Sequence, residues 1–185
     1  MDARTRYTKM IIKQEFLSLL KEKPLEKVTV KEICEKAKIN RGTFYKYYDN
    51  PFDLMQKLED ELLSNLQEKL SNVSSRGYHE AIKIVVEDVK ENLLFYSMTF
   101  EEKSDKRFRE RLFDICYGDN MEIIKKKFPN LDEAKKEWMY FFVAEGCNGI
   151  LKRWIEGGLK ESVDDVASFA ENVVRGLNEG LPDYL

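Results

Sequence analysis

The residues best suited to chemistry lie in the stretch INRGTFYKYYDNPFDL, which runs from Ile39 to Leu54. Two cations and three tyrosines gather within eight of its residues: Arg41, Tyr45, Lys46, Tyr47 and Tyr48. Arginine and lysine donate hydrogen bonds to O6 and N7 of guanine, and hydroxyl groups donate to phosphate oxygens. A tyrosine ring can also pack against the wall of a groove. The stretch is therefore suited to bind double-stranded DNA.

Groups that enzymes use for catalysis are sparse in the rest of the chain. His79 is the only histidine, and its sequence neighbours Tyr78 and Glu80 do not share its face of a helix. No GxSxG, HExxH or phosphate-binding glycine motif occurs. The sequence predicts that the protein is not an enzyme, that it holds no metal or cofactor, and that His79 lies on a helix surface.

The three cysteines, Cys34, Cys116 and Cys147, stand far apart and form no CxxC pair. An odd number of scattered thiols favours small apolar groups in a core over a metal site or a disulfide framework.

Composition is typical of a compact helical protein. The chain has 185 residues, 43% of them hydrophobic, and only 9 glycines and 4 prolines. No apolar run approaches the roughly 18 residues of a membrane span. The first ten residues, MDARTRYTKM, are polar and charged, so we expect no signal peptide, no membrane partner and a cytoplasmic location.

Charge is distributed unevenly along the chain. Residues 1–55 hold 12 Lys and Arg against 8 Asp and Glu, a net charge of +4. The remainder holds 19 against 26, a net charge of −7. A basic N-terminal part on an acidic body favours contact with a polyanion, although lysines also decorate ordinary helix surfaces.

Cap residues predict the helices that position the basic stretch. A first helix over about 5–22 should end before Pro24. Thr29 and Glu32 form the T-x-x-E capping pattern of a second helix. Asn40 is suited to cap a third, and Pro51 to open a fourth.

The two short helices of residues 29–48 predict a helix-turn-helix. Phe44 and Tyr48 lie four residues apart and should face the core, so that the cations and hydroxyls of the third helix point outward. The major groove admits one helix of this kind. A helical hairpin with a merely solvated charged face is the alternative that the pattern leaves open.

Residues of about 5–58 resemble the DNA-binding head of the TetR/AcrR family of transcriptional regulators. The resemblance rests on TVKEICEKAKINRGTFYKYYDNPFDL and on the preceding amphipathic helix that ends in EKPLEKV. It implies an all-α protein, with an N-terminal three-helix helix-turn-helix domain joined to a larger helical domain for ligand binding and dimerisation. We expect these domains at residues 1–50 and 51–185.

The resemblance also implies DNA contacts residue by residue. The matching positions are Thr29, Arg41, Gly42, Thr43, Tyr45, Lys46 and Tyr47. Thr29 and Tyr45 match phosphate contacts, Thr43 matches a phosphate or base contact, and the others match positions that face bases or groove walls. The sequence departs from the family where Pro51 replaces a lysine at the start of the fourth helix.

Beyond a polar break at 71–77, helical patterns cover about 78–99, 104–117, 119–127, 131–156 and 162–180. The last two patterns each carry apolar or small residues at alternating steps of three and four. Such stripes predict antiparallel packing and a four-helix dimer interface, with a wholly intramolecular core as the alternative. The predicted interface residues are Tyr140, Val143, Cys147, Ile150, Trp154, Val166, Ala170, Val173 and Leu177, and Val163 belongs to the same stripe. Gly146 and Gly149 would permit close approach of the helices.

Aromatic residues are frequent over about 78–127, where the resemblance implies a pocket for a small-molecule effector. Rings at helical spacing are more typical of a plain core. Acidic residues of this region, Glu87, Asp88, Glu101 and Glu102, would suit a cationic ligand but are more typical of a solvated face. No ligand-binding residue follows from the sequence.

The sequence thus favours a homodimeric, ligand-responsive repressor that binds a palindromic operator. The alternative is a helical co-regulator or activator that acts through a protein partner. A third reading, an interaction module that no longer binds DNA, stays open because of Pro51.

Overall fold

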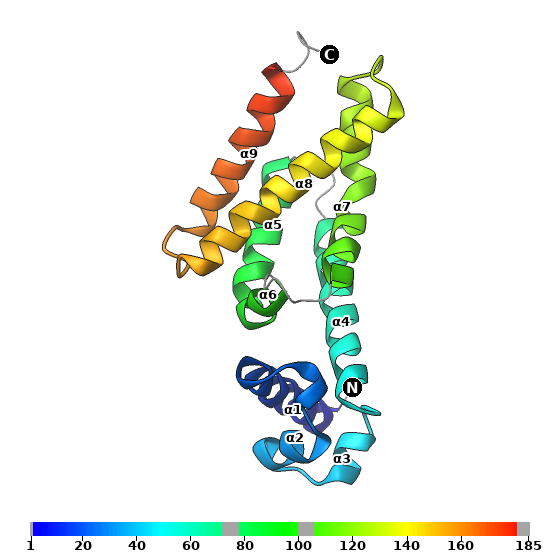
Figure 1. The fold of residues 1–185 in the computed structure, drawn as a ribbon, viewed down its shortest axis with the longest axis vertical. Helices are drawn as coiled ribbons and strands as arrows, with labels where there is room; N and C mark the ends of the chain where they lie inside the picture. The colour runs from blue at the N-terminus through cyan, green and yellow to red at the C-terminus, as the bar shows by residue number, and fades with distance from the viewer. Residues whose placement is uncertain (1, 72–77, 100–105, 181–185) are drawn as a thin grey trace. The chain divides into compact units, whose positions relative to one another are not determined.

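The computed structural model describes residues 2–71, 78–99 and 106–180. Every regular element in these ranges is a helix, which confirms the predicted all-α class. The elements are α1 Ala3–Glu22, the 3-10 helix η1 Leu25–Lys27, α2 Val30–Ala37, α3 Arg41–Tyr45, α4 Pro51–Ser71, α5 Tyr78–Glu91, α6 Leu93–Thr99, α7 Lys106–Lys127, α8 Glu133–Glu156 and α9 Val163–Gly180 (Figure 1). Within the described ranges, none of the helices combines the length and apolar character that crossing a membrane requires.

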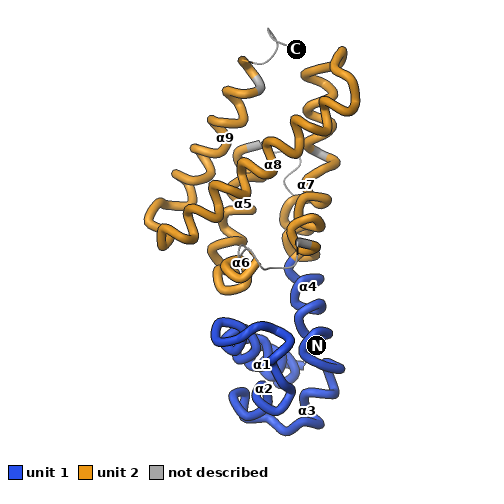
Figure 2. Tube along the Cα trace, viewed as in Figure 1, with its two compact units in different colours: residues 1–62 blue, residues 63–185 orange. Residues whose placement is uncertain are grey.

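The chain divides into two compact units, residues 1–62 and 63–185 (Figure 2). The division falls inside α4, so this helix contributes to both units. The predicted domain limits, residues 1–50 and 51–185, stay a prediction.

In the first unit, α1 packs against α2, and α2 packs against α3. Ile12, Phe16 and Leu19 are the buried residues of α1, and they recur at the three- and four-residue steps of one helix face. The helix ends at Glu22 because Pro24 cannot continue it. Ile33 of α2 is fully buried. Three amphipathic helices therefore share one small core.

In the second unit, α5 packs along α9, α7 packs on α8, and α8 contacts α9 (Figure 1). One part of its core joins Met121, Ile124 and Phe128 to Tyr140 of α8. Another part is aromatic: the ring of Phe95 lies 4.8 Å from Phe108 and 6.1 Å from Tyr96. These rings are plain core, as their spacing suggested.

Three helical patterns differ from their predicted extents. The pattern over 78–99 is divided into α5 and α6 at Asn92, whose carbonyl accepts hydrogen bonds from the backbone N–H groups of Phe95 and Tyr96. Asparagine favours such turns because its side chain bonds to nearby backbone, here to the carbonyl of Asp88. The patterns over 104–117 and 119–127 belong to the single helix α7, which continues through Gly118.

Candidate nucleic-acid interface

Helix α2 begins with the capping box that its sequence predicts. The backbone N–H of Glu32 donates to Thr29 Oγ1 over 3.3 Å, and Glu32 Oε2 accepts from the Thr29 backbone N–H and hydroxyl at 3.1 and 2.7 Å. Lys23, which follows α1, donates to the other oxygen of Glu32. The cap therefore ties the start of α2 to the end of α1. Thr29 is exposed, but its hydroxyl already serves the cap.

This cap gives a pH dependence that can be measured. Hydrogen bonds from Lys23 and then from Thr29 lower the pKa of Glu32 from 4.5 to about 2. Because the folded pKa is the lower one, the cap stabilises the fold above pH 4.5, and this contribution is lost as the pH falls towards 2. We expect Glu32→Gln to unfold with a midpoint temperature that depends less on pH in this range. Identical pH profiles for the parent and the variant would contradict this assignment.

The turn between α2 and α3 is set by two residues. Lys38 adopts a left-handed conformation, with φ of 53°, which ends α2. Asn40 then caps α3, because its Oδ1 accepts from the Thr43 backbone N–H at 2.7 Å and from the Thr43 hydroxyl at 3.0 Å. Together they fix where the second helix of the pair begins.

Helix α3 turns its aromatic residues in two directions. Phe44 is fully buried and Tyr48, just beyond the helix, is 3% exposed, with ring centroids 5.7 Å apart. Burial raises the pKa of Tyr48 to about 12, so it is a neutral core residue. Tyr45 lies beside Phe44 but is 55% exposed. The inward pair holds the helix against the core and leaves its opposite face open.

The open face carries the residues that the sequence singled out. Arg41, Gly42, Tyr45 and Lys46 are exposed, whereas Thr43 and Tyr47 are half-buried. A Cβ at Gly42 would meet only Asn40 Oδ1, at 3.4 Å, so the outer surface is open there. The structure thus gathers on one short segment the positions that match the DNA contacts of the resemblance.

Lys9 of α1 joins this face, and the sequence reasoning missed it. Its Nζ lies 5.5 Å from the centroid of the Tyr47 ring, and Lys46 Nζ lies 5.7 Å from the same centroid. Two cations on one ring make a positive patch beside α3. Helical periodicity could not reveal Lys9, because the contact joins two helices that are distant in the sequence.

A second lysine, Lys57, lies near the position where Pro51 interrupts the family pattern. Pro51 is buried at the first position of α4. Lys57 Nζ donates to the backbone carbonyl of Tyr47 at 3.1 Å and to Asp53 at 2.9 Å. The Lys57 contact, and then the backbone N–H of Asp49, lower the pKa of Asp53. Lys57 therefore links α4 to the end of the basic face.

Part of the predicted dimer stripe is buried inside the second unit. Four of its residues are buried in the protomer: Tyr140, Trp154, Val166 and Ala170. Val143, Cys147, Ile150, Val163 and Leu177 are half-buried, and Val173 is 42% exposed. The four buried residues pack within the protomer, where α8 and α9 contact each other and α9 also lies against α5, and the stripe as a dimer interface stays a prediction. The buried members have little surface left to offer a second copy.

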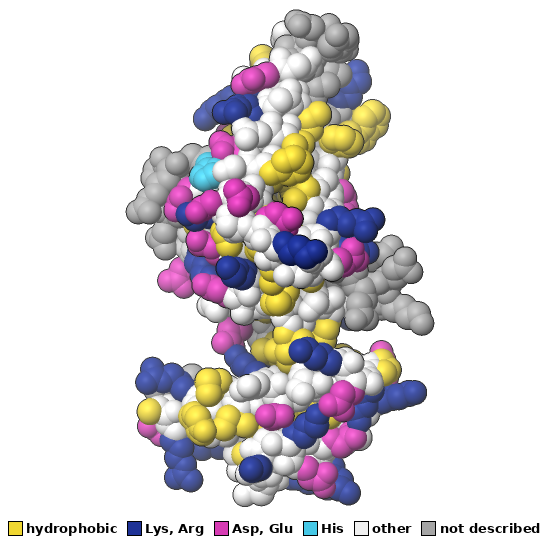
Figure 3. Space-filling model, turned by 90° about the vertical axis from the view of Figure 1, so that its left-hand side faces the viewer, with side chains coloured by type: hydrophobic (Ala, Val, Ile, Leu, Met, Phe, Trp, Pro, Cys, Tyr) yellow, Lys and Arg dark blue, Asp and Glu magenta, His cyan; other side chains and the backbone are white. Residues whose placement is uncertain are grey.

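A different set of apolar side chains is exposed on the same two helices. Trp138 and Phe142 of α8 are 67% and 68% exposed, and Phe169 of α9 is 59% exposed. Phe141 is also half in solvent. Farther along α8, a Cβ at Gly146 or Gly149 would meet no atom within 4 Å. Figure 3 shows hydrophobic side chains gathered on a face of the second unit. We call Trp138, Phe141, Phe142, Phe169 and Val173 the aromatic face.

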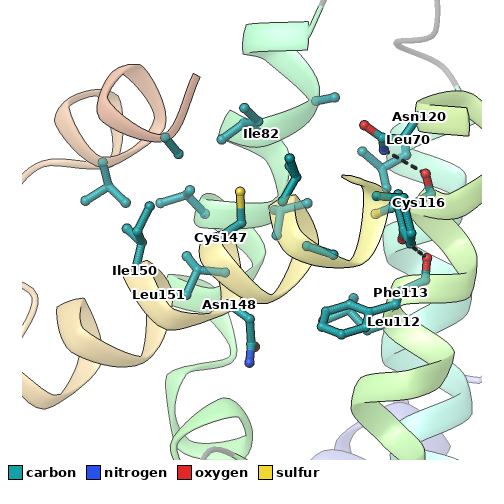
Figure 4. A pocket seen from close by; sticks show the side chains of 18 residues that line it. Leu70, Ile82, Leu112, Phe113, Cys116, Asn120, Cys147, Asn148, Ile150 and Leu151 are labelled. Carbon is teal, nitrogen blue, oxygen red and sulfur yellow. Dashed lines mark hydrogen bonds between the residues drawn. The ribbon is translucent and has the colours of Figure 1, made fainter. Parts of the chain in front are cut away.

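The second unit also contains a partly open cavity of about 140 Å³ (Figure 4). Its walls come from α4, α5, α7, α8 and α9. The residues that line it are Leu70, Ala81, Ile82, Val85, Val86, Leu112, Phe113, Cys116, Asn120, Tyr140, Val143, Ala144, Cys147, Asn148, Ile150, Leu151, Val166 and Ala170. Aliphatic side chains dominate, and the polar groups are few.

Glu87 and Asp88, two of the acidic residues considered for a cationic ligand, do not line this cavity. Glu87 is exposed, as expected of a solvated face. Asp88 is buried instead: it accepts hydrogen bonds from the Tyr96 hydroxyl at 2.9 Å and from Lys69 Nζ at 3.0 Å. Its charge is therefore used to join α4, α5 and α6. Glu101 and Glu102 lie outside the described residues.

The cysteines are buried or half-buried, and the histidine forms a contact between two helices. Cys34 is buried in the first unit, and burial raises its pKa. Cys116 and Cys147 are half-buried and line the cavity, and burial raises the pKa of Cys147. His79 lies at the surface of α5, 2.7 Å from Glu171 Oε2 of α9.

Comparison with known proteins gives two family matches. A profile described as bacterial regulatory proteins of the tetR family matches residues 17–56. A second profile, described as a transcriptional regulator C-terminal region, matches residues 77–176, which is more than half of the chain. Together they cover α3 and every residue that lines the cavity except Leu70.

Individual relatives are more distant. YxbF of Bacillus subtilis, an uncharacterized HTH-type transcriptional regulator, is 27% identical over 109 residues, or 55% of this chain and 29% of YxbF. The dhaKLM operon activator DhaS of Lactococcus lactis is 27% identical over 93 residues, 50% of this chain and 49% of DhaS. The matches thus span less than half of either curated relative. A putative TetR-family regulator from Syntrophomonas wolfei has the same fold, with a TM-score of 0.71, 18% identity, and coverage of 97% of this chain and 99% of that one.

Proposed function

This chain belongs to the TetR family of bacterial transcriptional regulators, and from that premise we propose that it is a homodimeric repressor whose α3 reads a palindromic operator. The observation that carries the proposal is the two-sided α3. Phe44 and Tyr48 anchor it to the core, while Arg41, Tyr45 and Lys46 are exposed. A short helix with a cationic, hydroxylated outer face fits the major groove.

Phosphate contacts are expected around this helix. Tyr45 presents its hydroxyl in the family's phosphate-binding position, and Lys9 and Lys46 flank the Tyr47 ring. Cations and hydroxyls at the edge of a reading helix fix its register on the duplex. Because the Thr29 hydroxyl is engaged in its cap, we expect Thr29 to contribute less than these lysines.

The aromatic face supports a homodimer. Large exposed rings on two adjacent helices are unusual on a monomer and are suited to an isologous two-fold interface. Gly146 and Gly149 leave room for a helix of the second copy to approach α8 closely. A two-fold dimer presents two copies of α3 and therefore requires a site with two related halves.

The cavity supports regulation by a small molecule. It is bounded by α8 and α9, which also carry the aromatic face, and by Leu70 of α4. A ligand that favours one arrangement of these helices would select a spacing of the two α3 copies that no longer fits the operator. The DhaS relative carries the name of an activator, so an activator or co-regulator acting through a protein partner is the alternative. The cavity favours the ligand-responsive regulator.

Arg41→Ala and Tyr45→Phe should separate base reading from phosphate binding. We expect Arg41→Ala to cost about 1–3 kcal/mol of binding and to relax the preference at one base pair of each half-site. Tyr45→Phe should weaken every sequence alike, because a phosphate carries no sequence information. Gel-shift titrations against an operator and its single-base variants measure both. Unchanged base preference in Arg41→Ala would refute its role as a reader.

Selection of bound duplexes from a random pool tests the proposal as a whole. We expect a palindrome with two half-sites, and an affinity for it that falls steeply as salt is raised, since phosphate contacts release counterions. Recovery of a single asymmetric half-site would argue against the dimer. Failure to enrich any sequence, with no salt-dependent binding to random DNA, would favour the protein-partner alternative.

A further inference from the structure

We infer that the cavity of the second unit takes an electrically neutral, mostly hydrocarbon ligand of about one aromatic ring, with a single hydrogen-bond donor directed at Asn120. This inference rests on the proposed function, because it names the ligand class to which such a regulator would respond. It differs from the cationic ligand that the acidic residues of this region would also have suited.

Charge is the first reason. No Asp, Glu, Lys, Arg or His is among the side chains that line the cavity in the described part of the chain. A charged ligand would lose its water without gaining an opposite charge, which is costly in an apolar site. Asp88, the acidic group buried in this unit, is already paired with Lys69 and Tyr96.

Size is the second reason. A cavity of about 140 Å³ is close to that of engineered apolar cavities of about 150 Å³, which bind benzene. One ring with one or two further atoms matches this space.

The uncommitted polar groups are the third reason. The Tyr140 hydroxyl donates to the carbonyl of Phe113, and Asn120 Nδ2 donates to the carbonyl of Cys116 at 2.7 Å. Asn120 Oδ1 accepts no hydrogen bond from the described residues and stays available as an acceptor. Figure 4 shows Asn120 beside Cys116 at one end of the cavity, whereas Asn148 extends away from the other labelled side chains. A hydroxyl or N–H on the ligand would therefore face Asn120.

Four one-ring probes of similar size test the charge and polarity of the site: ethylbenzene, benzyl alcohol, benzylamine and benzoate. At pH 7 the last two are a cation and an anion. We expect both neutral probes to bind, with the affinity for benzyl alcohol at least ten-fold above that for benzylammonium or benzoate. Isothermal calorimetry and the rise in unfolding temperature with ligand concentration measure this on the full chain. Comparable binding of a charged probe, or no binding of either neutral one, would overturn the inference.

Asn120→Leu and Asn148→Leu form a matched pair for the polar contact. We expect Asn120→Leu to bind ethylbenzene as the parent does and benzyl alcohol about ten-fold more weakly, the effect of one lost hydrogen bond. Retained ethylbenzene binding also shows that the variant is folded. Asn148→Leu also changes a residue that lines the cavity, but it keeps the Asn120 contact, so it should leave the ratio of the two affinities as it is in the parent. A benzyl alcohol affinity that falls relative to that for ethylbenzene in Asn148→Leu but not in Asn120→Leu would refute the assignment.

These measurements are made without DNA, so the two proposals can fail separately. Binding of neutral probes by a chain that selects no operator would leave the ligand class standing and remove the proposed regulator. Operator binding by a chain that binds no neutral probe would support the proposed regulator and refute the ligand class.

Discussion

Replacing Trp138 and Phe142 together by glutamate is expected to convert the protein to monomers and to lower its operator affinity at least 100-fold. Each ring is about two-thirds exposed in the protomer, and a large aromatic residue buries roughly 150–250 Å² when covered. Glutamate would bring like charges together across the two-fold axis and would bury them without a partner. A monomer loses the second α3, and with it an avidity gain of about 10²–10⁴.

Sedimentation velocity and gel shifts with full and half operators measure this prediction. The double variant should sediment with half the mass of the parent dimer. It should bind a half operator with the same affinity as one DNA-binding unit of the parent. Ile123→Glu is the control. It also replaces an exposed apolar residue by glutamate, but Ile123 lies on α7 and is 43% exposed. A double variant that stays dimeric would place the interface elsewhere.

Local chemistry made the first unit predictable. Capping is decided within four residues, so Thr29 with Glu32 and Asn40 with Thr43 could be assigned from spacing alone. The inward positions of Phe44 and Tyr48 follow from helical geometry in the same way. Lys9 and Lys57 needed the structure, because their contacts with the Tyr47 ring and carbonyl depend on how separate helices pack.

The second unit shows why an apolar stripe does not name its partner. The steps of three and four along α8 and α9 predicted antiparallel packing, and the two helices do contact each other. The same periodicity fits packing within a protomer or between two protomers. Trp154 and Ala170 are buried in the protomer, whereas Trp138, outside the stripe, stays exposed. The positions of α5 and α7 determine which faces of α8 and α9 are buried within the protomer. The periodicity of α8 and α9 carries no information about those positions.

The cavity was still harder to predict, because its walls combine residues from five helices. Leu70 of α4 and Ala170 of α9 border the same space although they are distant in the sequence. The acidic residues around Glu87 were expected to form a solvated face, which Glu87 does, but the sequence does not show that the neighbouring Asp88 is buried and paired with Lys69. A charged residue in a sequence therefore indicates a ligand site only when it is known not to be paired with another residue of the protein.

The neighbours Phe44 and Tyr45 provide the second large effect, since one ring points into the core and the next points outward. Phe44→Ala removes a fully buried ring and should cost about 3–5 kcal/mol, a large part of the stability of a small domain. Tyr45→Ala removes a ring that is 55% exposed and that contacts Phe44 edge-on, so it should lower the free energy of unfolding by about 1.5 kcal/mol at most. For DNA affinity at a temperature where both variants are folded, the order reverses, and Tyr45→Ala should lose about ten-fold or more.

Urea unfolding followed by two signals can assign the loss to the first unit. Both tryptophans, Trp138 and Trp154, belong to the second unit, so their fluorescence reports that unit, whereas far-ultraviolet circular dichroism reports helices of both. Phe44→Ala should shift the dichroism transition to lower urea and leave the tryptophan transition nearly in place. If Tyr45→Ala were the more destabilising change, α3 would face the other way. Arg41, Thr43 and Lys46 could then not be the residues that meet DNA.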